Sequence, residues 1–176
     1  MTLFGLIAAT GLRISEALAL RLGDMLPDGI LHIRETKFCK SRLVPLHVTV
    51  VQALDRYLNA RRRLAGTDDH LFPAIKQKAL AASTVNYTFR CVLRRANIAP
   101  NRSRQPRIHD LRHTFATRVL EQCSAERNAV ARHSVALATY LGHVDIKQTY
   151  WYLQSTAELM TDIAAAAETL AGREAQ

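Results

Sequence analysis

Apolar residues recur at helical spacing in several stretches of this chain and form short strand-like runs in one region. The apolar cluster at residues 3–7 predicts a short buried helix that is broken at Thr10. A second helix is expected over residues 14–22. Two strands are expected over residues 30–34 and 42–46, where apolar runs are bounded by turn signals. This pattern predicts an antiparallel hairpin in the first third of the chain.

Most of the rest of the chain is predicted to be helical. Ser83 is a candidate N-cap because its hydroxyl can accept a hydrogen bond from the first helical turn. The further helices are expected at residues 49–64, 83–96, 109–122, 135–141, 145–152 and 157–171. The predicted fold class is therefore mainly α with a small antiparallel β-sheet.

Length and composition indicate a globular protein with a polyanionic partner. The 176 residues, 48% of them hydrophobic, predict a single domain over residues 1–176 with a proper core. Lys and Arg number 24 against 15 Asp and Glu, which gives a net charge of +9. A surplus of this size points to nucleic acid, although a merely basic surface would explain it too.

Cysteine usage and the apolar start narrow the class further. Cys39, Cys91 and Cys123 are widely spaced, so neither a disulfide framework nor a zinc site is indicated. The apolar stretch over residues 3–9 is too short to span a membrane. We expect a cytoplasmic protein without a metal or other cofactor.

Residues suited to phosphodiester chemistry lie in separated segments. Arg13 and Arg112 offer guanidiniums, His109 and His143 offer imidazoles, and Tyr152 offers a hydroxyl nine residues after His143. A backbone phosphate is negative and gains charge as a fifth oxygen arrives, so bidentate arginines are its natural clamps. The set therefore suits attack on a phosphodiester by a tyrosine.

Five motifs occur in one order and cover residues 3–159. They are Thr10-Gly11-Leu12-Arg13-Ile14-Ser15-Glu16, Glu35-Thr36-Lys37 leading into Arg42-Leu43-Val44-Pro45-Leu46, His109-x-x-Arg112, Leu141-Gly142-His143, and Tyr152. In these motifs the chain resembles the catalytic domain of the tyrosine recombinases, or phage-integrase-type site-specific recombinases. The resemblance implies the catalytic-domain fold of that family.

The resemblance also implies roles for the clamp and the nucleophile. Tyr152 would attack the scissile phosphate, giving a 3′-phosphotyrosyl link and a 5′-hydroxyl. A free tyrosine has a pKa of about 10, so it needs a proton acceptor, and His109 is the family's candidate. Arg13 and Arg112 would hold the two non-bridging oxygens.

Three further residues have supporting roles in the resemblance. His143 would donate a hydrogen bond to the phosphate, and Lys37 would protonate the leaving 5′ oxygen. Glu16 would orient the catalytic basic groups from behind them. No metal is expected, because the arginines and Lys37 supply the positive charge that a metal otherwise would.

Two assignments have competitors within the sequence. Tyr150 lies two residues before Tyr152, which is preferred because its interval from His143 matches the family. Lys40 competes with Lys37, which follows the first strand of the hairpin as in the family.

Each residue taken alone also has a purely structural interpretation. Arg13 and Glu16 could form an i,i+3 surface ion pair. His143 could cap a helix after Gly142, and the aromatic residues around Tyr152 could belong to the core. The functional interpretation rests on their occurrence as a set.

The partner expected for this chain is double-stranded DNA, bound by a tetramer on paired sites. Candidate DNA contacts are Arg102, Arg104 and Arg107, which precede the helix of His109. Other basic clusters, at residues 61–63 and 94–95, are expected to be solvated helix faces. A helix over about residues 156–171 would either dock on a neighbouring subunit or fold back on its own core.

Strand exchange on DNA is the first functional hypothesis. A catalytically idle DNA-binding remnant and an activity like that of type IB topoisomerases are the alternatives. The first residues already fit the catalytic domain, so the N-terminal helical domain with which such recombinases close around DNA is expected to be absent from this chain.

Overall fold

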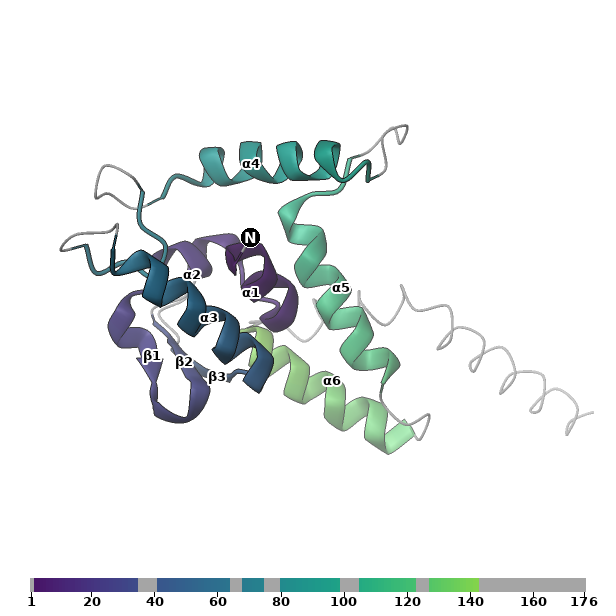
Figure 1. Cartoon of the computed structure of the whole chain (residues 1–176). Coiled ribbons are helices and arrows are strands. Elements are labelled where there is room, and N and C mark those ends of the chain that lie inside the picture. The colour runs from purple at the N-terminus through teal and green to yellow at the C-terminus, as the bar shows by residue number, and fades with distance from the viewer. Residues whose placement is uncertain are drawn as a thin grey trace, which may run out of the picture. The chain divides into compact units, whose positions relative to one another are not determined.

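The computed structural model describes residues 2–34, 41–63, 68–74, 80–98, 105–122 and 127–142 (Figure 1). The chain divides into two compact units, Met1–Arg112 and His113–Gln176. In chain order the elements are α1 (Thr2–Thr10), α2 (Ile14–Ala19), the 3-10 helix η1 (Leu22–Asp24), β1 (Met25–Leu26), the 3-10 helix η2 (Pro27–Gly29), β2 (Ile30–Ile33), β3 (Arg42–Pro45), α3 (Val48–Arg61), α4 (Ala82–Arg95), α5 (Ile108–Glu121) and α6 (Arg127–Leu141). The predicted class, mainly helical with a small antiparallel sheet, is confirmed.

A glycine turn separates the first two helices. Leu6 and Ile7 bury the inner face of α1, and the Thr10 hydroxyl donates a 2.6 Å hydrogen bond to the Leu6 carbonyl. Gly11 then takes a φ of +63°, a conformation that disfavours residues with a Cβ. The chain reverses there and enters α2 through Arg13, which occupies the N-cap position.

The sheet is antiparallel, with strand order β1-β2-β3. Leu31, Ile33 and Val44 are all buried, so the sheet packs one face on the core of the first unit. Before β2, Gly29 has a φ of +70°, and a Cβ built there would lie 2.8 Å from Val51 Cγ2. Both the backbone conformation and the close approach of α3 therefore require glycine at this turn.

Helix packing completes the core of the first unit. α1 contacts α2 and α3, and α2 contacts α4. Val85, Phe89 and Leu93 recur every four residues along α4 and are buried. The ring of Phe89 meets Phe4 of α1 edge-on, with the ring centroids 5.1 Å apart.

The second unit has its own small apolar cluster. Ala116 and Leu120 on α5 pack with Leu137 and Leu141 on α6, with Phe115, Val119 and Tyr140 against them. The rings of Phe115 and Tyr140 stack with centroids 5.7 Å apart. Among the described helices of both units, none is long and apolar enough to cross a membrane.

Several predicted boundaries are wrong. The second helix ends at Ala19 because Leu20 takes an extended backbone (φ −58°, ψ 136°). Ser83 lies within α4, whose N-cap is Ala81 without a side-chain hydrogen bond. The helix predicted from residue 135 begins at Arg127, and the short strand β1 was not predicted. The helices expected over residues 145–152 and 157–171 lie outside the described residues.

Candidate active site

The glycine turn between α1 and α2 brings the first predicted arginine together with its carboxylate. The backbone N–H of Arg13 donates to Glu16 Oε2 and its Nη1 donates to Glu16 Oε1, both at 2.9 Å. The side chain of Arg13 is 29% exposed, whereas that of Glu16 is 5% exposed. The i,i+3 ion pair of the structural interpretation is therefore present, but its carboxylate is buried rather than at the surface.

A second arginine, from the sheet, shares this carboxylate. Arg42 opens β3 and donates from Nη1 to Glu16 Oε1 at 3.1 Å and from Nη2 to Glu16 Oε2 at 2.8 Å. Its side chain is 11% exposed. Each oxygen of Glu16 thus accepts two hydrogen bonds from charged or backbone donors, in the bidentate geometry that suits a guanidinium.

Ionisation of Glu16 follows from competing effects. Burial raises the pKa of the carboxyl, but the hydrogen bonds from Arg42 and Arg13 outweigh burial, and the net shift is below the usual value of 4.5. Glu16 is therefore a carboxylate at neutral pH. Two guanidiniums around one carboxylate leave a single positive charge at the N-terminus of α2, which suits an anionic ligand.

The second predicted arginine reaches the same turn from far along the chain. Arg112 on α5 is 1% exposed, and its Nη1 donates a 2.6 Å hydrogen bond to the Gly11 carbonyl. This bond joins residues 101 positions apart within the first unit. Arg112 consequently fixes the backbone of the turn that presents Arg13.

The first turn of α5 places the remaining described candidates. Ile108 is buried and anchors the turn, whereas His109 is exposed. Arg107 is exposed as well, and its backbone N–H donates to Asp110 Oδ2 at 2.8 Å. His109 therefore lies one helical turn before buried Arg112, on the solvent side.

The structure thus brings Arg13, Glu16 and Arg112 together at the Gly11 turn, with His109 nearby on α5. The other predicted site residues lie outside the described residues: Lys37, Arg102, Arg104, His143 and Tyr152. The functional roles of all these site residues, described or not, stay predictions.

Arg42 is the site residue that the sequence interpretation missed. Side chains alternate between the faces of a strand, so Arg42 shares its face with buried Val44, while Leu43 is 56% exposed. A basic residue at a core-facing position of a strand requires a buried partner. That parity is the signal that could have identified it.

A different buried arginine holds the segment after α3. Arg61, predicted to be solvated, is 6% exposed and donates from Nε and Nη2 to the His70 carbonyl at 3.1 and 2.7 Å. It also donates to the Asp68 carbonyl. The prediction failed for Arg61 because the chain returns along α3 and covers this position.

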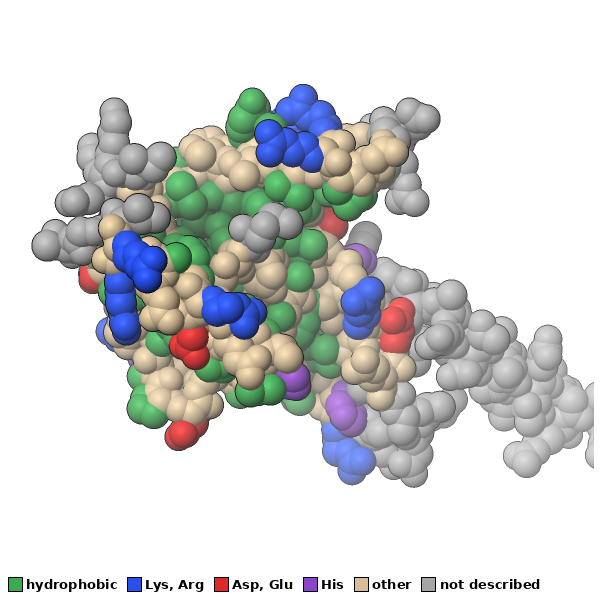
Figure 2. All heavy atoms as spheres, in the orientation of Figure 1, with side chains coloured by type: hydrophobic (Ala, Val, Ile, Leu, Met, Phe, Trp, Pro, Cys, Tyr) green, Lys and Arg blue, Asp and Glu red, His purple; other side chains and the backbone are tan. Residues whose placement is uncertain are grey.

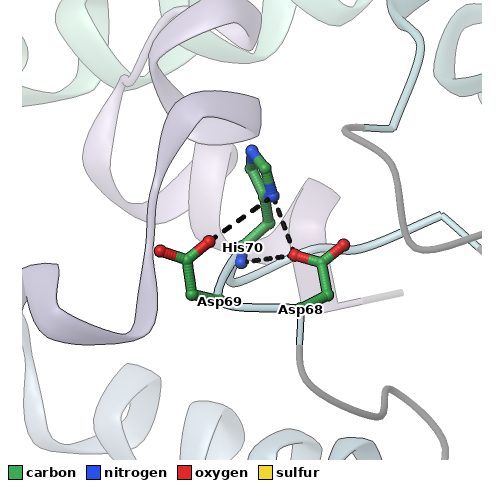
Figure 3. A group of neighbouring side chains, drawn as sticks. All are labelled: Asp68, Asp69 and His70. Carbon is green, nitrogen blue, oxygen red and sulfur yellow. Dashed lines mark hydrogen bonds and ion pairs between the residues drawn. The ribbon is translucent and has the colours of Figure 1, made fainter.

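Asp68, Asp69 and His70 form a cluster whose ligand atoms lie within 4.8 Å of one another (Figure 3). Asp68 Oδ1 accepts from the backbone N–H of His70 and meets its Nδ1, both at 2.8 Å, and these bonds lower the pKa of Asp68. Asp69 pairs with Arg21 at 2.7 Å. The cluster thus fits a role in shaping the loop beside Arg61.

Basic side chains also stand on the outer surface of α3 and α4, visible in blue in Figure 2. On α4, a hollow of about 570 Å³ is lined by Tyr87, Arg90 and Arg94, with Leu93, Asn97, Ile98 and Gln105. Tyr87 is 60% exposed. This surface offers charge and an aromatic ring to a large anionic partner.

Comparison with known proteins adds independent findings. Residues 1–158 match the phage integrase family. A Sinorhizobium fredii (strain NBRC 101917 / NGR234) protein that bears the name integrase/recombinase y4rB is 38% identical over 91% of this chain and 52% of its own length. Tyrosine recombinase XerD of Chlamydia trachomatis is 32% identical over 88% of this chain and 48% of its own length.

A solved structure agrees with these matches. The crystal structure of XerA recombinase superposes with a TM-score of 0.73 and 26% identity, covering 92% of this chain and 54% of that one. The chain spans about half the length of the curated relatives that it matches.

Proposed function

Because the chain belongs to the phage integrase family, we propose that it is the catalytic domain of a site-specific DNA recombinase in which Tyr152 is the nucleophile. One observation supports the chemistry most strongly. The guanidinium of Arg112 donates a hydrogen bond to the Gly11 carbonyl, and the guanidinium of Arg13, two residues further along the same turn, donates one to Glu16. Such preorganised positive charge stabilises a phosphate that gains negative charge during attack.

The two arginines contribute in different ways. Arg13 is partly exposed, so a DNA phosphate can reach its guanidinium directly. Arg112 is almost wholly buried and bonded to Gly11, so its charge is held in place before substrate arrives. We assign both to the non-bridging oxygens of the scissile phosphate, with His143 as a further donor.

The reaction conserves the number of phosphodiester bonds. The Tyr152 oxygen attacks phosphorus, the bond to the 5′ oxygen breaks, and a 3′-phosphotyrosyl ester forms. His109, exposed on the first turn of α5, accepts the tyrosine proton, and Lys37 gives a proton to the leaving 5′ oxygen. Attack by another 5′-hydroxyl reverses these steps and joins new partners.

Double-stranded DNA is the proposed substrate and partner. The net charge of +9 and the exposed arginines of α4 favour a polyanion. We extend the proposal to Arg102, Arg104 and Arg107 as contacts to the DNA backbone. We also propose a tetramer on paired sites.

The test is covalent capture on DNA. The chain is incubated with a pool of nicked duplexes of randomised sequence, in which the released fragment diffuses away and traps the intermediate. A denaturing gel then compares the wild type with Tyr152→Phe and with Tyr150→Phe as the matched control. We expect a DNA-linked band that only Tyr152→Phe abolishes.

Other results would point elsewhere. DNA binding without a covalent band would indicate an idle DNA-binding protein. A covalent band together with relaxation of any supercoiled plasmid, without a requirement for specific sites, would favour the topoisomerase alternative. A band lost in Tyr150→Phe would refute the choice of nucleophile.

A further inference from the structure

We propose that Arg42 is a positioning residue for catalysis, one that orients the guanidinium of Arg13 through the carboxylate of Glu16. The inference rests on the proposed function, because it assumes that Arg13 contacts the scissile phosphate. Arg42 itself lies behind the carboxylate, where its side chain is 11% exposed, and is not assigned to the DNA.

The hydrogen bonds leave the carboxylate little freedom. Arg42 occupies both oxygens of Glu16 at 3.1 and 2.8 Å, and Arg13 occupies the same two oxygens at 2.9 Å each. Rotation of the Glu16 carboxylate would lengthen its hydrogen bonds to Arg13 and to Arg42 at the same time. Since one of those bonds goes to Nη1 of Arg13, the orientation of Glu16 sets the orientation of the Arg13 guanidinium.

The sheet supplies the rigid support. Arg42 pairs with Ile33 in the register of β2 and β3, and Ile33 is 2% exposed. The backbone of Arg42 is therefore fixed by the core of the first unit. Groups held on strands are positioned more narrowly than groups on loops.

The position of Arg42 also lowers the stability of the fold in one respect, which an ion pair that served stability alone would not require. Its Nε is buried and has no hydrogen-bond partner in the part of the chain that the structure describes. A buried donor without a partner is destabilising. Arg42 thus keeps both hydrogen bonds to Glu16 while its Nε donor stays without a partner among the described residues. This arrangement fits a role in orienting Glu16.

A substrate with one charge removed tests this role. Replacing one non-bridging oxygen of the scissile phosphate by methyl removes the charge that an arginine must neutralise, so a clamp variant regains rate on that substrate. The two stereoisomers of the methylphosphonate distinguish the two oxygens. The isomer that restores Arg13→Gln therefore identifies the oxygen facing Arg13.

The experiment measures single-turnover cleavage by the full chain, on a nicked duplex selected by covalent capture. Arg42→Gln removes both the positive charge and the guanidinium that donates two hydrogen bonds to Glu16. Arg42→Lys keeps the charge but cannot donate two parallel hydrogen bonds. Arg34→Gln is the control. Arg34 pairs with Asp24 rather than Glu16 and directly follows Ile33, the residue that pairs with Arg42 in the sheet. Thermal unfolding of each variant is recorded alongside.

We expect Arg42→Gln to cleave the phosphodiester about a hundred-fold more slowly, as misplacement of a reacting group does. We expect its DNA binding to match that of Arg34→Gln, which loses the same charge. The same methylphosphonate isomer should restore the cleavage rates of Arg42→Gln and Arg13→Gln. The cleavage rate of Arg42→Lys on the phosphodiester should lie between those of Arg42→Gln and the wild type. This last variant keeps the test valid if Arg42→Gln does not fold.

Three results would overturn the inference. Cleavage by Arg42→Gln at the rate of Arg34→Gln would show that Arg42 is dispensable. Equal slowing on the phosphodiester and on both isomers would show a structural defect only. If the wild-type chain forms no covalent product with any duplex in the pool, the proposed function fails, and this inference fails with it.

Discussion

At the scale of single residues, the buried carboxylate of Glu16 sets how the arginines of the site are arranged. A carboxylate buried to 5% exposure would be strongly destabilising alone, and here two arginines compensate it. Arg112 acts on the same turn from below through Gly11. Glu16, Arg42 and Arg112 thus fix the turn, so the proposed phosphate would meet a geometry that is already set.

The pH dependence of stability follows from the same carboxylate. The pKa of Glu16 is lower in the folded chain than the ordinary value of 4.5, so its contribution is fully present above that value and is lost as pH falls through the folded pKa. Glu16→Gln should lose about 3 kcal/mol at pH 7, because both arginines lose their counter-charge. Its loss relative to the wild type should then shrink below a pH of about 4.5.

Urea unfolding at a series of pH values checks this prediction. Asp110→Asn is a suitable control, since that carboxylate pairs at 3.5 Å with exposed Arg107. A Glu16→Gln deficit that stays constant from neutral pH to well below the ordinary carboxyl value would contradict the assignment.

At the scale of elements, the sequence predicts what depends on local pattern and misses what depends on tertiary contact. The strands at Ile30–Ile33 and Arg42–Pro45 match their predictions within one residue, because turn signals bound them. The early end of α2 coincides with a hydrogen bond from the Leu71 N–H to the Leu20 carbonyl, a tertiary contact that local propensity does not contain.

The candidate site shows the same division. The motifs predict roles for Arg13, Glu16 and Arg112 because each stands in a recognisable short context. The partnership of Arg42 with Glu16 joins positions 26 residues apart, and the burial of Arg61 depends on the segment that returns along α3. Both arise only when the chain folds, although strand parity gave a signal for Arg42.

The anchoring of the segment after α3 by Arg61 can be tested by substitution. Arg61→Leu should destabilise the chain by about 2 kcal/mol, because the carbonyls of Asp68 and His70 lose their donor. Arg62→Leu, the adjacent and exposed position, should change stability by less than about 0.5 kcal/mol. Chemical denaturation of both variants measures the difference, and equal effects would refute the anchoring role.

At the scale of the whole molecule, the net charge makes the proposed binding of DNA testable. With a net charge of +9, affinity for any duplex should fall steeply with salt, with a log–log slope of about −0.9 for each phosphate contacted. This attraction does not depend on sequence. In the proposed function, it would bring the Gly11 turn to the DNA backbone before any site is recognised.

The exposed Arg107 provides a specific test of this attraction. Arg107→Gln should make the salt slope shallower by about 0.9, if the residue contacts one phosphate as proposed. Arg21→Gln is the control, since Arg21 is also exposed and paired with an aspartate, Asp69. Fluorescence anisotropy on an arbitrary duplex over a salt series gives both slopes. A slope for Arg107→Gln equal to that of the wild type would remove Arg107 from the DNA surface.

The proposed function requires that Tyr152 become covalently joined to a DNA 3′ phosphate. The most direct measurement is mass spectrometry of the trapped complex after nuclease and protease digestion. We expect one nucleotide-bearing peptide, with the phosphate on the Tyr152 oxygen and linked to a 3′ position. A nucleotide on Tyr150 or on another residue, a link through a 5′ phosphate, or DNA cleavage without any linked peptide would contradict it.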